Sequence, residues 1–157
     1  MSRVARSARV GSRQRPETIE ANKTIAQAES GEYYIVIHPD DGSTLTITLP
    51  TCQEGSYFKF IMPVGLVDNG STIKFQAQAG NFLNGGPLAI NGNATDPGDQ
   101  VTGNGSSNLV LTLDGNTDVL ANGFLEFVSD GTSWFISGLI MCADGTTITN
   151  SIAITDS

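Results

Sequence analysis

Three side chains of the sequence, one histidine and two cysteines, are of types that often perform catalysis or bind metal ions. His38 is the only histidine, which excludes a metal site built from several histidines and leaves a Cys–His pair dependent on one residue. Cys52 and Cys142 lie far apart and show no CxxC spacing, so we expect reduced, partly buried thiols. These three residues therefore favour structural roles over catalysis.

Asp-Gly and Asn-Gly sequences recur along the chain and raise the possibility of calcium binding. They occur at residues 40–42, 68–70, 114–116, 130–131 and 144–145, but none follows the spacing of an EF-hand loop. Such pairs supply the positive φ angles of tight turns. We favour turns over calcium sites and predict no metal-binding residue.

Paired carboxylates could perform general acid–base catalysis, as in glycosidases, if two of them shared one cleft. The only adjacent pair is Asp40-Asp41, and a single Trp makes a sugar-binding cleft less favoured. The GNGSS sequence at 103–107 lacks the lysine of a phosphate-binding loop, and there is no GxSxG motif. We therefore predict no enzymatic activity, catalytic residue, cofactor or small-molecule substrate.

The N-terminal segment carries most of the positive charge. Residues 1–15 contain five of the eight basic residues and no acid, whereas the rest of the chain has three lysines and 16 acidic residues, a net charge of −13. A charge asymmetry of this kind is typical of an interaction tail on a folded body. We define residues 1–16 as the arm, and its predicted partner-binding residues are Arg3, Arg6, Arg9, Arg13 and Arg15.

The partner of the arm should be acidic. Nucleic acid is one alternative, because five arginines could neutralise about five phosphates. The arm has no aromatic residue to stack on bases and the body is acidic, so a protein surface is favoured over nucleic acid. No apolar run reaches the length of a membrane span or a signal peptide, so we predict no membrane association.

The remaining residues, 17–157, are predicted to form one β domain, because alternating or β-branched runs are separated by turn sequences and helical periodicity is absent. The expected strands are 32–37, 43–49, 56–62, 72–76, 88–90, 108–113, 124–128, 132–137 and 146–154. Asp130-Gly131 predicts a hairpin between two of them, with Trp134 in the core.

About nine or ten short strands favour an all-β fold, namely an antiparallel sandwich, a jelly roll or a partly closed barrel, with an extended N-terminal arm. Residues 80–108 are rich in Gly and Asn and exceed the length of an ordinary β connection. We expect this segment to be a protruding loop or an excursion that packs against a neighbour.

Two stretches of the sequence resemble virion proteins of tailed bacteriophages. They are TIEANKTIAQAESGEYYIVI with STLTITLPTCQEGSYFKFI, and the later SDGTSWFIS, so the resemblance covers about residues 18–80 and 123–137. The pattern is similar to that of capsid decoration, or cement, proteins, which are compact β modules and commonly homotrimers.

The resemblance implies a structural protein that binds the outer surface of a phage head through its arm and β body and stabilises the shell. Its implied partner is the major capsid protein, and its implied location is the capsid surface of the virion, assembled in the host cytoplasm. A receptor- or glycan-binding module of a phage fibre or tail is the alternative. The resemblance transfers no catalytic or binding residue to this chain.

Overall fold

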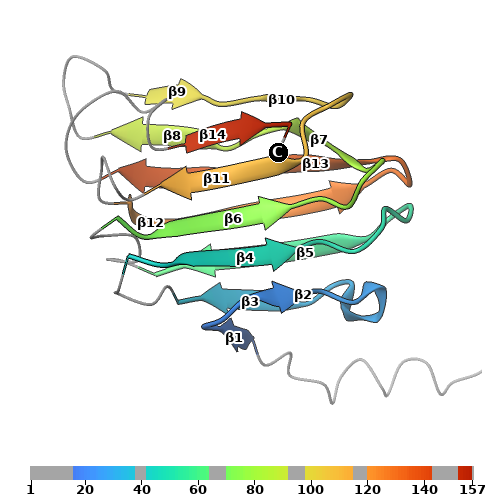
Figure 1. Cartoon of the computed structure of the whole chain (residues 1–157), viewed down its shortest axis with the longest axis horizontal. Coiled ribbons are helices and arrows are strands. Elements are labelled where there is room, and N and C mark those ends of the chain that lie inside the picture. The colour runs from blue at the N-terminus through green and yellow to red at the C-terminus, as the bar shows by residue number, and fades with distance from the viewer. Residues whose placement is uncertain are drawn as a thin grey trace, which may run out of the picture.

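The structure, a computed structural model, describes residues 16–37, 42–63, 70–91, 98–114, 120–142 and 152–156. Figure 1 shows two β-sheets stacked one in front of the other. Sheet A has nine strands. Seven of them follow the order β1-β3-β5-β12-β13-β7-β10, while β8 also pairs with β13 and β9 pairs with β8. Sheet B has five strands in the order β14-β11-β6-β4-β2. The predicted all-β sandwich is confirmed, with more strands than the nine or ten expected.

The strands alternate with short connections and one 3₁₀ turn, η1 (Gln27–Glu29). Sheet A contains β1 (Glu17–Ile19), β3 (Tyr33–Val36), β5 (Tyr57–Met62), β7 (Phe82–Gly85), β8 (Leu88–Asn91), β9 (Gly98–Gln100), β10 (Gly103–Asn104), β12 (Leu120–Ser129) and β13 (Ser133–Cys142). Sheet B contains β2 (Lys23–Thr24), β4 (Thr44–Thr48), β6 (Thr72–Gln76), β11 (Val110–Asp114) and β14 (Ile152–Thr155).

The first six strands form three coils that cross from one sheet to the other. β1, β3 and β5 lie side by side in sheet A, and β2, β4 and β6 lie side by side in sheet B (Figure 1). Because each coil returns to a sheet in the same direction, the neighbouring strands pair in parallel. A strand of the opposite sheet thus provides the crossover that parallel pairing requires. The expected antiparallel arrangement is wrong for this half of the molecule, and both sheets are mixed.

The second half contains the predicted hairpin. β12 pairs antiparallel with β13, and Ser129 lies opposite Trp134 next to the turn. Gly131 has φ +94°, and Oδ1 of Asp130 accepts hydrogen bonds from the backbone N–H groups of Thr132 and Ser133, both at 2.8 Å. This is the Asx-type turn that an Asp-Gly sequence favours.

The segment expected to be a loop at 80–108 is instead part of sheet A in its described residues. β7 and β8 pair in parallel with successive stretches of β13, while β9 and β10 run back beside them. The glycines allow a close approach between backbones: a Cβ atom at Gly86 would lie 1.7 Å from the carbonyl oxygen of Val101, and one at Gly103 would lie 2.5 Å from that of Leu83. The glycine content therefore reflects tight strand packing and not only turns.

The core lies between the sheets and is rich in aromatic rings. Phe60 of β5 contacts Tyr34, Phe75 and Phe127, with ring centroids 5.2, 4.9 and 5.5 Å away, and Phe75 comes from sheet B. Trp134 is fully buried as predicted, and its indole N–H donates to the carbonyl of Pro50 at 3.3 Å. The edge-to-face contact between Phe60 and Phe75 joins the two layers.

Candidate interaction surface

The predicted arginine site lies outside the described residues. Arg3, Arg6, Arg9, Arg13 and Arg15 all precede residue 16, where the description begins. The first strand after them, β1, is at the edge of sheet A. The chain therefore enters its folded body at a sheet edge, close to the ion pairs of Lys23 with Glu17 (2.8 Å) and Glu29 (2.9 Å). Charged side chains at an edge oppose uncontrolled strand pairing with other molecules.

The residues considered for catalysis are not brought together where the structure describes them. His38, Asp40 and Asp41 lie outside the described residues. Cys142 is buried at the end of β13 and Cys52 is half-buried before β5, and both cysteines are reduced. Burial raises the pKa of Cys52, which disfavours the nucleophilic thiolate. Across the described ranges, no three His, Cys, Asp or Glu residues are grouped so as to hold a metal ion.

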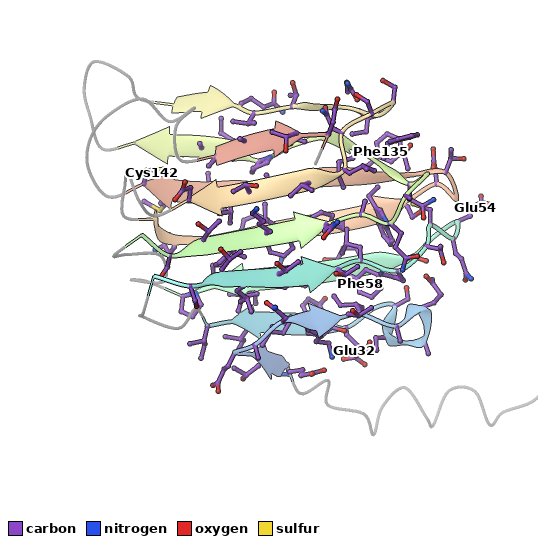
Figure 2. The ribbon with its side chains drawn as sticks, in the orientation of Figure 1. Glu32, Glu54, Phe58, Phe135 and Cys142 are labelled. Atoms are coloured by element: carbon purple, nitrogen blue, oxygen red, sulfur yellow. The ribbon has the colours of Figure 1, made fainter. Side chains whose placement is uncertain are left out.

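The outer face of sheet A is the most unusual surface in the described part of the chain. Seven large apolar side chains there are 38–46% exposed, and alternation along each strand points all seven away from the core. They are Ile37, Ile61, Leu88, Ile90, Val128, Phe135 and Met141. Figure 2 labels Phe135 toward one end of β13 and Cys142 at the other, with sticks along the strand between them. We call this surface the apolar face.

Strand register arranges the apolar face in rows that run across the strands. Residues directly opposite one another in neighbouring strands share a face, so each row can be read from the pairing. The first apolar row consists of Ile35, Ile61, Phe124, Leu139 and Leu88. The polar row consists of Tyr33, Lys59, Glu126 and Ser137. The second apolar row consists of Tyr57, Val128 and Phe135, beside Asn84.

The polar row contains a fixed and electrically neutral group at its centre. Nζ of Lys59 lies 2.8 Å from Oε1 of Glu126, and the hydroxyl of Tyr57 donates to the same oxygen at 3.1 Å. The hydrogen bond from Lys59 lowers the pKa of Glu126, whereas burial and the Glu126 carboxylate raise the pKa of Tyr57 to about 12. The Glu126 carboxyl is therefore ionised at neutral pH and forms an ion pair with Lys59. Nζ of Lys59 also lies 4.6 Å from the ring centroid of Phe124.

The outer face of sheet B has the opposite character. Its strands alternate buried apolar residues with outward polar residues, as in TLTIT of β4 and TIKFQ of β6. The outward residues of β4, β6 and β11 are Thr44, Thr46, Thr48, Thr72, Lys74, Gln76, Thr112, Asp114 and the buried Val110. Sheet B thus presents an ordinary solvated surface, whereas sheet A presents apolar side chains on both of its faces.

The sequence contains a signal for the apolar face that the predictions did not use. In β5, β12 and β13 apolar residues occupy both phases of the alternation, for example Phe60 with Ile61, Phe124 with Leu125, and Trp134 with Phe135. Strands that are apolar in both phases are typical of sheets covered on both faces. Sheet B covers the inner face of sheet A, and none of the described strands covers the outer face.

In the described residues, no helix is both long and apolar enough to cross a bilayer. Comparison with known proteins finds no matching family model, no matching curated protein and no matching solved structure.

Proposed function

We propose that this chain is a non-enzymatic structural protein that binds other protein subunits within a larger assembly. The observation that carries the proposal is the apolar face, because it gathers seven large apolar side chains that are 38–46% exposed, and exposed apolar patches bordered by polar residues mark interaction sites. A protein partner would cover it as sheet B covers the inner face, with two sheets packing about 10 Å apart.

We further propose that the assembly is the head of a tailed bacteriophage and that the chain is a capsid decoration protein. This assignment rests on the sequence resemblance and on the basic arm. A single exposed Arg–carboxylate pair contributes only about 0.2–1 kcal/mol. Five arginines on one arm, in several copies of the chain held together, raise the effective concentration of each contact and give firm attachment to an acidic capsid surface.

A receptor- or glycan-binding module of a phage fibre or tail is the second candidate, and the polar row together with the neighbouring Tyr57 favours it. Tyr33 and Tyr57 lie edge to face with centroids 6.4 Å apart, next to Lys59 and Glu126. Half-buried tyrosines beside fixed polar groups are common in recognition surfaces. Binding of the purified chain to host cells, and not to heads, would support this candidate.

The test uses phage heads prepared without this protein, from the phage that encodes the chain. The full chain should sediment with the heads, and a chain lacking residues 1–15 should lose most of its occupancy at physiological salt. A chain with all five arginines replaced by lysine keeps the charge and is the matched control, which should retain most of the binding. Undiminished occupancy of the truncated chain would refute the role of the arm.

A further inference from the structure

The rows of the apolar face are each chemically uniform, and this makes the face complementary to itself. Apolar side chains of four adjacent strands, β3, β5, β12 and β13, make up most of the first apolar row. The polar row crosses the same four strands, with its acid and its base on the two central ones, β12 and β5. A second copy can therefore meet this face row against row if the strand order is reversed.

We propose that the apolar face binds the same face of a second copy of this chain, about a two-fold axis parallel to β5 and β12 and midway between them. This inference rests on the proposal that the face is a protein interface. The axis exchanges β5 with β12 and β3 with β13, and it keeps each row at its own height along the strands. Such an isologous contact requires one patch to be its own complement.

The axis brings matching side chains together. Ile61 faces Phe124 of the second copy, and Ile35 faces Leu139 of the second copy, because these residues are symmetrically placed in the first apolar row. In the polar row, Lys59 faces Glu126 of the second copy, so that two ion pairs become a ring of four alternating charges. The buried charges are then balanced, as an interface core requires.

Charge also favours this face for contact between identical chains. Outside residues 1–15 the chain has a net charge of −13, so two copies repel each other over most of their surfaces. Among the residues that make up the three rows, Glu126 is the only acid, and Lys59 forms an ion pair with it. Glu32 and Glu54 lie at strand ends, away from the middle of the sheet (Figure 2).

The size of the face suits a stable pair. The strands that form it, β3, β5, β12, β13, β7 and β8, contain 38 residues. At about 3.3 Å per residue and about 4.8 Å between strands they cover roughly 600 Å². Specific protein interfaces begin at about this area per partner.

The experiment measures the mass of the full-length chain in solution by light scattering at micromolar concentration. The wild type should have the mass of two chains. Lys59→Glu places four acids in the centre of the contact, and Glu126→Lys places four lysines there, so each variant should weaken association by about 30-fold or more. An equimolar mixture of the two variants should restore a pair that contains one chain of each. Lys74→Glu makes the same charge change on the outer face of sheet B and should leave the mass at two chains.

The mixture distinguishes lost association from lost folding, since only folded chains with facing charges can restore the pair. A monomeric wild type would overturn the inference, as would three chains, the number that the sequence resemblance implies. A pair that dissociates equally in the Lys59 and Lys74 variants would overturn it too. A monomer that still binds phage heads would leave the proposed function standing and remove only the second copy.

Discussion

Replacing one phenylalanine on each side of sheet A, Phe60 or Phe135, by alanine should have opposite consequences for stability and association. Phe60 is fully buried and contacts three other rings, one of them in sheet B. Phe→Ala in a core costs about 3–5 kcal/mol, and three ring pairs place Phe60→Ala at the upper end of that range. Phe135 is 43% exposed, so Phe135→Ala should cost only about 1 kcal/mol within one chain.

Urea unfolding followed by the fluorescence of Trp134, the only tryptophan, measures both free energies. Two protein concentrations are needed, because self-association adds stability that depends on concentration. Phe60→Ala should lose the same free energy of unfolding at both protein concentrations. Phe135→Ala should lose mainly the part of the stability that depends on protein concentration. Equal losses from the two substitutions in the dilute protein would refute the assignment of Phe60 to the inside and Phe135 to the outside of the sandwich.

Two further results are expected. Gly86→Ala should destabilise the fold by about 3 kcal/mol or more in urea unfolding, since its Cβ would overlap the carbonyl of Val101. The control is Gly80→Ala, which has positive φ and open space around it and should cost only about 1–2 kcal/mol. Similar losses from both substitutions would contradict the close approach of the strands at Gly86. The Lys59 hydrogen bond lowers the pKa of Glu126 in the folded state, so its stabilising contribution is complete above the ordinary glutamate pKa of 4.5 and is lost as pH falls through the lower folded value. Glu126→Gln and Lys59→Met should each flatten the loss of stability below pH 4.5, and an unchanged slope would count against the ion pair.

The strands with clear alternation could be predicted from the sequence, and the arrangement of the strands could not. The TIKFQ strand of residues 72–76 is confirmed at both ends, and the Asp130-Gly131 hairpin has the predicted turn. β12 and β13 are longer than expected because they continue through Gly123 and Gly138, which resemble strand ends in sequence. At both positions a Cβ would lie 2.2 Å from a carbonyl oxygen of the neighbouring strand, so packing and not a turn requires glycine there.

The parallel coils were missed for a different reason. The turn sequences indicate reversals of the chain, but they do not say whether the next strand joins the same sheet or the opposite one. β1 and β2 have three and two residues, too few for a periodic pattern, although they complete the first coil. Strand pairing over long sequence separations is a tertiary property that local patterns do not encode.

The candidate surface was only partly accessible to sequence reasoning. The arginines of the arm stand out by charge, and their role stays a prediction because residues 1–15 lie outside the description. The apolar face depends on which phase of each strand turns inward, and in β13 large apolar residues such as Trp134 and Phe135 occupy both phases. The structure shows which phase points outward, because Trp134 is fully buried and Phe135 is 43% exposed.

Oxidation of two methionines by hydroxyl radicals would test most directly whether the apolar face is covered in solution. Met141 is 40% exposed on this face, and Met62 is 4% exposed in the core. In the full-length wild type both should be oxidised slowly, and in Lys59→Glu only Met141 should become fast while Met62 stays slow. Rapid oxidation of Met141 in the wild type, at the rate of the variant, would show that nothing covers the face and would contradict its role as an interface.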